Sequence, residues 1–306
     1  MVRANADRAR KDPSAIAYLG ELDHGGSAIS LPVTNRAELL QVSPTDGLTS
    51  LTKVPPGRPR VGPERLYPED VRTFARVVPN DLVVADGVRA LLPGKGRRAT
   101  AILHGQNIAD RELTAILVHR LRQVGSEPAF VEVLRDDVEA VPGLIRRLAA
   151  SRPAAIVLVG RHGPATAAAL AAIARRQPGA AVVGTAGLLA GWRRTGLPSL
   201  RAVTPVLPRE AQPAAGRALL RDLERRTGAP ARPEALYGFA AMRLVLAAVD
   251  RAGPDRRGVV RAARAPGPRR TALGTLSLDR DGDVRTRRLA VVRIRRGQET
   301  GELVAP

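Results

Sequence analysis

Short apolar runs alternate with amphipathic helical patterns along most of this chain, and this alternation restricts the fold more than any other feature. The runs that predict buried strands span residues 16–19, 39–42, 74–78, 100–103, 129–134, 154–159 and 181–184. Between two of them, a helical spacing lines up Leu113, Ile116, Leu117, Leu121 and Val124 on one face. Strand–helix alternation of this kind predicts an α/β fold with parallel sheets covered by helices.

The size and composition limit the classes of protein that the chain can represent. Its 306 residues predict two lobes rather than one domain, and no apolar run approaches the length that crosses a bilayer. Because the chain has no cysteine, disulfides, thiolate metal sites and a cysteine nucleophile are excluded. The first residues are charged and lack an apolar stretch, so the chain as written carries no signal peptide.

The net charge of +20 raises the possibility of a nucleic-acid partner. The basic residues are dispersed, however, and nearly all of them are arginine in a chain also rich in alanine, glycine and proline. Only 2% of the residues are aromatic, whereas single-strand nucleic-acid modules interleave aromatic side chains with basic ones. The pattern favours a compositional bias toward arginine over a nucleic-acid surface.

The last third of the chain changes character. Residues 233–253 predict a long helix that ends at Gly253. The side chains expected to form its apolar stripe are Leu236, Phe239, Met242, Leu246 and Val249. Residues 273–284 predict a strand, a tight turn and a returning strand. Earlier, residues 49–70 are too rich in proline and glycine for a regular element and form either a functional or a flexible loop.

Several segments, in a consistent order, carry a family resemblance. They are residues 12–20, 26–35, Leu40-Gln-Val-Ser-Pro44, 65–79, 237–244 and 274–283. Together they resemble the type I periplasmic binding proteins of branched-chain amino acid ABC transporters. The resemblance implies two Rossmann-like lobes with parallel sheets flanked by helices, and a hinged cleft between the lobes that clamps a small ligand.

The resemblance also implies how the lobes divide the chain. Lobe one takes residues 1–80 and 208–289, and lobe two takes residues 81–207 and 290–306. In the family, a strand, a helix and a second strand precede the helix that begins here near Ala4. We therefore expect lobe one to be incomplete at its N-terminus, through a mispredicted start codon, a fragment or a degraded gene.

Carrying the family's ligand positions over residue by residue gives a set of candidates that departs from the usual amino-acid pattern. The first turn of lobe one supplies His24, and the second supplies Ser43 and Thr45, with Gly47 where a threonine is common. In lobe two the aromatic positions correspond to Ile108 and to Arg161 or His162. Ala186 stands where a carboxylate would meet a ligand ammonium. These replacements favour an anionic or carboxylate-bearing ligand over a zwitterion.

Each candidate also has a structural interpretation. His24 can cap the helix that follows it, His162 can be a loop residue, and Ser43 and Thr45 can satisfy the backbone of their turn. His104 and His119 are expected to be structural, and no metal site or cofactor is expected. The acidic run Asp279–Asp283 fits a hairpin turn better than a calcium loop, because its glycine comes too early.

The sequence therefore predicts a solute-binding component of an ABC importer, outside the cytoplasm, either periplasmic or tethered to the membrane. It would be a monomer that captures a small amino-acid-like or carboxylate ligand and delivers it to a membrane permease, without enzymatic activity and without nucleic acid. Three alternatives remain at this stage. They are a ligand-sensing regulatory domain of the same fold, a non-functional fragment, and a basic nucleic-acid binder.

Overall fold

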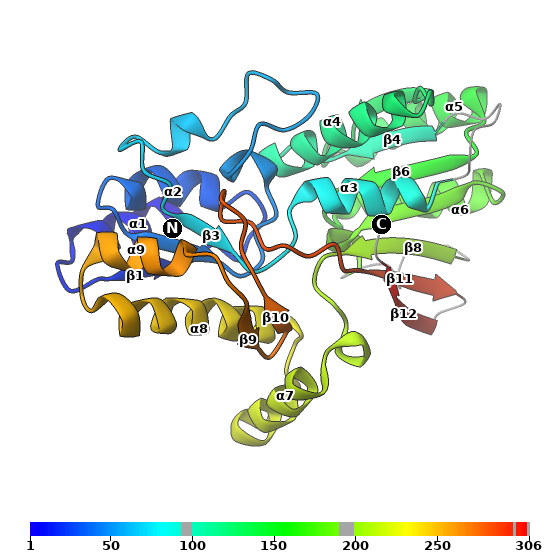
Figure 1. Ribbon diagram of the computed structural model, residues 1–306. Coiled ribbons are helices and arrows are strands. Elements are labelled where there is room, and N and C mark those ends of the chain that lie inside the picture. Colours follow the sequence, from blue (N-terminus) through cyan, green and yellow to red (C-terminus); the bar gives the residue numbers. More distant parts are fainter. Residues whose placement is uncertain (93–99, 190–198, 296–297, 305–306) are drawn as a thin grey trace. The chain divides into compact units, whose positions relative to one another are not determined.

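The computed structural model describes residues 1–92, 100–189, 199–295 and 298–304. The chain divides into two compact units, and each is built from two separate segments (Figure 1). Unit 1 comprises Met1–Asp81 and Val206–Arg287, and unit 2 comprises Leu82–Pro205 and Arg288–Pro306.

Unit 1 contains a sheet of three parallel strands in the order β1 (Ala17–Leu19), β2 (Leu40–Ser43) and β3 (Phe74–Arg76). Ala17 lies opposite Leu40, and Gln41 lies opposite Phe74. Because side chains alternate along a strand, Leu40 and Val42 face one side of this sheet and Gln41 faces the other. Strand β3 is shorter than the predicted run at 74–78.

The helices of unit 1 cover both faces of that sheet. Leu40 and Val42 belong to the apolar core formed with α7 (Ala214–Thr227), α8 (Glu234–Ala252) and α9 (Arg256–Arg264). On the opposite face, the Gln41 side chain donates to Ser30 and accepts from Thr34, both on α2 (Ser27–Asn35). Helix α1 (Val2–Lys11) contacts α2. Unit 1 is thus a three-layered α/β body.

The predicted apolar stripe of α8 is largely wrong. Phe239, Met242 and Leu246 are 43%, 43% and 47% exposed, although Leu236 is buried as expected. The buried face instead consists of Leu236, Tyr237, Ala240, Ala241, Leu244, Val245 and Ala248. It contains three alanines, which allow the helix to lie close to the sheet and which a search for large apolar residues overlooks.

The predicted hairpin at 273–284 is displaced. Strand β9 (Arg269–Thr271) pairs in antiparallel fashion with β10 (Gly274–Leu276), so the regular hairpin lies earlier in the chain. A single bridge between Leu278 and Val284 closes the acidic turn that follows.

That acidic turn is held by cations from the first segment of unit 1. Lys53 Nζ lies 2.6 Å from Asp279 and 2.9 Å from Asp283, and the wholly buried Arg76 donates to Asp283 at 2.8 Å. Burial alone would raise the pKa of Asp283. The charge of Arg76 and the hydrogen bonds from Lys53 and Asn80 outweigh burial and lower that pKa to about 2. The acidic run is therefore structural.

Unit 2 is a doubly wound sheet. Its strand order is β12-β11-β8-β7-β6-β4-β5. The parallel strands are β4 (Thr100–His104), β5 (Phe130–Val133), β6 (Ala155–Val159), β7 (Ala181–Thr185) and β8 (Ser199–Thr204). Strand β11 (Leu289–Arg295) runs antiparallel to β8 and to β12 (Gln298–Val304). The sequence pattern did not predict β8, where Arg201 interrupts the apolar run.

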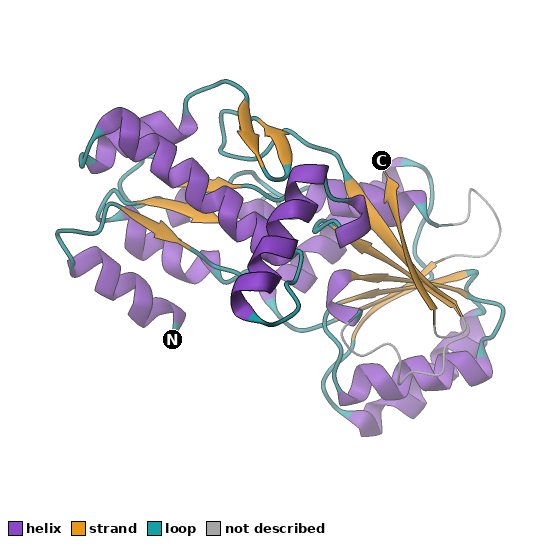
Figure 2. Cartoon of the chain, turned by 90° about the horizontal axis from the view of Figure 1, so that it is seen from below, coloured by secondary structure: helices purple, strands orange, loops and turns teal. Residues whose placement is uncertain are grey.

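Helices cover both faces of the unit 2 sheet (Figure 2). Alternate residues of β4 belong to different cores. Leu103 packs in the core with α5 (Val141–Ser151) and α6 (Pro164–Arg176). Ile102 packs in the core with α3 (Asp81–Ala90) and α4 (Ile108–Gln123). The predicted α/β class with parallel sheets flanked by helices is confirmed.

None of the helices in the described part of the chain has both the length and the apolar character that crossing a membrane requires.

Candidate functional site

A cavity of about 200 Å³ lies at the carboxyl ends of β4, β5 and β6 in unit 2. Each of these strands is followed by residues that line it. They are Gly105, Gln106 and Asn107 after β4, Leu134, Arg135 and Asp136 after β5, and Gly160, Arg161, His162 and Gly163 after β6. The site is therefore built from loops that the parallel sheet brings to one edge.

The position of this cavity follows from the order of the strands. Within the sheet, β4 has β5 as its neighbour on one flank and β6 on the other, so the chain runs from β4 to β5 and then back past β4 to β6. The loops after β4 and β6 consequently diverge, and a crevice opens between them. Ligands of open α/β sheets bind in such crevices, at the carboxyl ends of the strands.

The loop after β4 is shaped by the first turn of α4. Asn107 caps the helix by accepting from the backbone N–H of Asp110 at 2.8 Å, and its amide donates to the Asp110 carboxylate at 2.6 Å. Asp110 is 6% exposed, and a Cβ atom on Gly105 would collide with its Oδ2 atom. An asparagine followed three residues later by an acid is typical of a capped helix start, and the sequence-based prediction did not include it.

The loop after β6 contributes Arg161 and His162 to the cavity. The backbone N–H of His162 donates to the Gly187 carbonyl at 3.0 Å, which fixes the loop against the turn after β7. The Nε2 atom of His162 is buried and has no hydrogen-bond partner among the described residues. Arg161 is exposed at the rim, as is Arg135 from the loop after β5.

Helix α6 begins at this cavity without a side-chain cap. Its N-cap is Gly163, and Pro164 at the first helical position has no N–H. The first-turn N–H groups of an α-helix have no partner within the helix, and the helix dipole places partial positive charge there. Arg135, Arg161 and this helix end bring positive charge to the cavity, and the Asp136 carboxylate lies beside Gly163 at the start of α6.

In unit 1, the structure pairs His24 with an aspartate that the sequence pattern did not indicate. Its Nε2 atom lies 2.9 Å from Oδ2 of Asp81, whose side chain is 3% exposed. The alternative interpretation of His24 as a helix cap is wrong, because Gly26 is the N-cap of α2 and the His24 side chain is paired with Asp81. A Cβ atom on Gly47 would lie 2.9 Å from Oδ1 of Asp81, so this pair explains the glycine.

The hydroxyl groups predicted to meet the ligand in unit 1 both bind backbone carbonyls. Ser43 donates to the carbonyl of Glu21 at 2.7 Å, and Thr45 donates to the carbonyl of Leu22 at 2.7 Å. Both bonds join the turn after β2 to the turn after β1. The structure therefore gives these two side chains the structural role that the sequence left open.

The remaining predicted residues of unit 2, Ile108 and Ala186, do not line the cavity. Ile108 is the first residue of α4 and is 38% exposed. Ala186 begins the short helix after β7, and it is Leu188 from that helix that reaches the cavity. Of the predicted lobe-two residues, His162 lines the cavity, together with the alternative Arg161. The lining residues that the prediction missed include Asn107, Asp110, Arg135 and Asp136.

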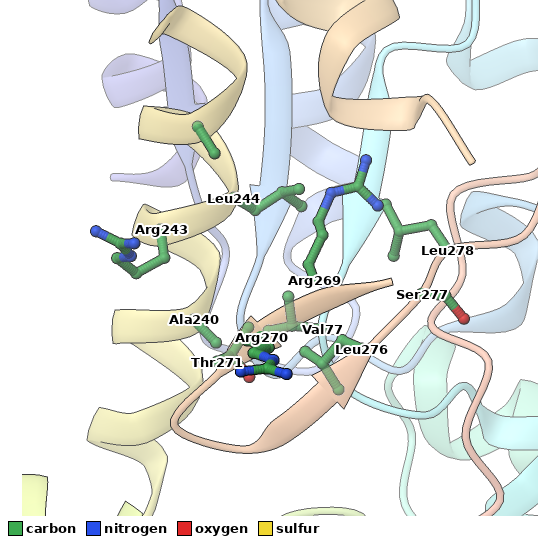
Figure 3. A pocket seen from close by; sticks show the side chains of 11 residues that line it. Val77, Ala240, Arg243, Leu244, Arg269, Arg270, Thr271, Leu276, Ser277 and Leu278 are labelled. Atoms are coloured by element: carbon green, nitrogen blue, oxygen red, sulfur yellow. The ribbon is translucent and has the colours of Figure 1, made fainter. Parts of the chain in front are cut away.

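A smaller cavity, of about 70 Å³, lies within unit 1 between α8 and the β9–β10 hairpin (Figure 3). Val77, Leu244 and Leu276 give it apolar walls. The Arg269 side chain passes along it and donates to the carbonyls of Ala263 and Ala265 at the end of α9. None of the predicted site residues lines this cavity. Among the described residues no cluster of acidic, histidine or cysteine side chains could hold a metal ion.

Comparisons with known proteins agree with this architecture. A family model described as periplasmic binding protein matches residues 80–299. An ABC transporter substrate-binding protein from Desulfitobacterium hafniense, solved with Leu, has a TM-score of 0.78 at 14% identity, covering 98% of this chain and 84% of its own. A leucine binding protein from Thermotoga maritima has a TM-score of 0.77 at 17% identity, covering 100% of this chain and 84% of its own.

A solute-binding protein of an ABC transporter from R. palustris, solved with benzoate, has a TM-score of 0.75 at 15% identity. It covers 100% of this chain and 82% of its own. At these identities the likeness concerns the fold. No curated protein sequence matches this chain.

Proposed function

Because this chain belongs to the periplasmic binding protein family, we propose that it is the solute-binding component of an ABC importer and captures a small solute that carries a carboxylate. Its place of action would be outside the cytoplasm, and its protein partner would be a membrane permease. The chain would bind and release its solute without chemistry.

The observation that carries the proposal is the cavity at the carboxyl edge of the unit 2 sheet. It combines the Arg161 and Arg135 side chains, the buried Nε2 atom of His162 and the uncapped start of α6. Guanidinium groups and helix N-termini both bind carboxylates, the former by paired hydrogen bonds. Leucine and benzoate, which the similar solved proteins hold, share one carboxylate on an apolar body.

The test is a binding screen on the whole chain with L-leucine, L-isoleucine, benzoate and 4-hydroxybenzoate. A solute that binds only the folded state stabilises it by about 2.7 kcal/mol at a concentration 100 times its Kd, so its binding raises the Tm. Calorimetric titration then gives the Kd of any solute that raises the Tm.

Two variants locate the bound solute. We expect Arg161→Ala to raise the Kd about 10- to 100-fold, because a hydrogen bond to a charged group contributes about 1.5–3 kcal/mol. Arg176→Ala removes an exposed arginine from the opposite end of α6 and should leave the Kd unchanged. If no carboxylate in the screen raises the Tm, or if both variants bind equally well, the proposal is wrong.

A further inference from the structure

The start of α2 in unit 1 has the form of an anion-binding site, but its backbone donors are already used. The N–H groups of Gly26, Ala28 and Ile29 donate to the carbonyls of Asp23, Gly25 and Gly26. The two that remain in this stretch, from Gly25 and Ser27, both donate to the side chain of Asp46.

The Asp46 carboxylate occupies the position in which an anion would meet these donors. Its Oδ1 atom accepts from Gly25 at 2.9 Å and from Leu48 at 3.1 Å, and its Oδ2 atom accepts from Ser27 at 2.8 Å. The residue is fully buried. A carboxylate that accepts several backbone N–H groups at the positive end of a helix is strongly held.

The hydroxyl groups of the same turn are engaged as well. Ser43 accepts from the Asp46 backbone N–H at 2.9 Å and donates to Glu21, and Thr45 donates to Leu22. The Asp81 carboxylate lies next to Gly47 and is bound to His24. A second carboxylate brought to this turn would meet negative charge, and these hydroxyls have already given their one proton elsewhere.

We propose that Asp46 is a specificity-determining residue that acts as a built-in carboxylate and closes the start of α2 to the carboxylate of any solute. This inference rests on the proposed function in one respect, that a solute carboxylate is what the chain selects. The carboxylate of the solute is then left to the cavity of unit 2.

The test replaces the side chain by a free anion and needs no solute. In Asp46→Ala, the carboxylate is missing and the backbone donors are left unsatisfied, so the Tm should fall. Sodium formate at about 100 mM should then raise the Tm of this variant along a saturable curve, because formate binds only the folded state. Sodium chloride at the same ionic strength should not.

Two matched variants separate a specific site from a general salt effect. Asp46→Asn fills the same space with an amide, so formate should not restore its Tm. Asp255→Ala removes an exposed capping carboxylate from the start of α9, where water replaces it, and formate should not raise its Tm either. If Asp46→Ala does not fold in chloride, the yield of folded protein on refolding in formate against chloride gives the same answer.

Three outcomes would overturn the inference: no recovery of Asp46→Ala in formate, equal recovery of Asp46→Asn, or a wild-type Tm that rises with formate as steeply as that of Asp46→Ala. The formate experiment can succeed even where every solute in the binding screen fails. A failure of the proposed function and a failure of this inference are therefore distinguishable.

Discussion

Two buried aspartates of unit 1 are stabilised by different means. Backbone N–H groups hold Asp46, whereas the side chains of Lys53, Arg76 and Asn80 hold Asp283. Removing a buried carboxylate leaves its partners without a counterpart, which costs more than the net contribution of the interaction itself. Both residues are therefore sensitive positions, and Asp283 also links stability to pH.

We expect Asp283 to make unit 1 less stable in acid. Its pKa is lowered from 3.8 to about 2 in the folded chain, so its contribution is fully present above pH 3.8 and is lost as the pH falls through about 2. The contribution is about 2 kcal/mol. Denaturant unfolding of the wild type and of Asp283→Asn should show a difference in the free energy of unfolding that shrinks between about pH 4 and pH 2. A difference that stays constant over this range would contradict the assignment.

For single residues, the sequence predicted the positions of turns better than the roles of the side chains in them. It placed Ser43, Thr45 and Gly47 in one turn after a strand, and the structure has that turn. It could not identify the partners, because His24 and Asp81 are 57 positions apart and Asp46 and Ser27 are 19 apart. A residue's chemistry in such a turn depends on pairings between loops, which local sequence patterns do not encode.

Among the elements, α8 shows how an apolar pattern can indicate the wrong face. Large apolar residues recur along the side that carries Phe239, Met242 and Leu246, yet the helix packs through Leu244, Val245 and several alanines. Close packing favours small side chains where a helix meets a sheet, and apolar side chains left singly on the surface are common.

We expect two leucines of α8, two positions apart, to differ sharply in their effect on stability. Leu244 is 6% exposed and lies in the unit 1 core, so Leu244→Ala should lower the free energy of unfolding by about 2–4 kcal/mol. Leu246 is 47% exposed, and Leu246→Ala should change it by less than about 0.5 kcal/mol. Urea unfolding of the two variants checks this, and equal losses would show that the sequence-based stripe is the packed face.

The strands that were predicted and the strands that were missed differ in their surroundings. Strands β4, β6 and β7 lie inside a parallel sheet with helices on both faces, and such strands are continuous apolar runs. Strand β8, which was missed, lies where antiparallel pairing with β11 begins, and its Arg201 lies opposite Arg293 of β11. Strands interrupted by charged residues do not stand out as apolar runs.

For the whole molecule, some of the arginines behind the net charge of +20 have a structural use. Arg256 donates to the carbonyls of Asp12, Ala15 and Ala37, and Arg264 donates to those of Phe74 and Asp281. These arginines serve as hydrogen-bond donors that join segments far apart in sequence.

The division of each unit into two chain segments also sets an order in time. During synthesis, β4 to β8 of unit 2 follow one another in a single segment and can pair as soon as that segment leaves the ribosome. Strands β1 to β3 are made earlier, but α7, α8 and α9, which cover one face of them, come only after residue 206.

We therefore expect chains truncated after residue 205 to resist protease within residues 82–205 while residues 1–81 are still cleaved. Chains truncated after residue 287 should be protected in both segments. Protection of residues 1–81 in the shorter chain would contradict this order. Until the residues after 206 have been made, the face of β2 that α7, α8 and α9 cover in the folded protein therefore stays exposed.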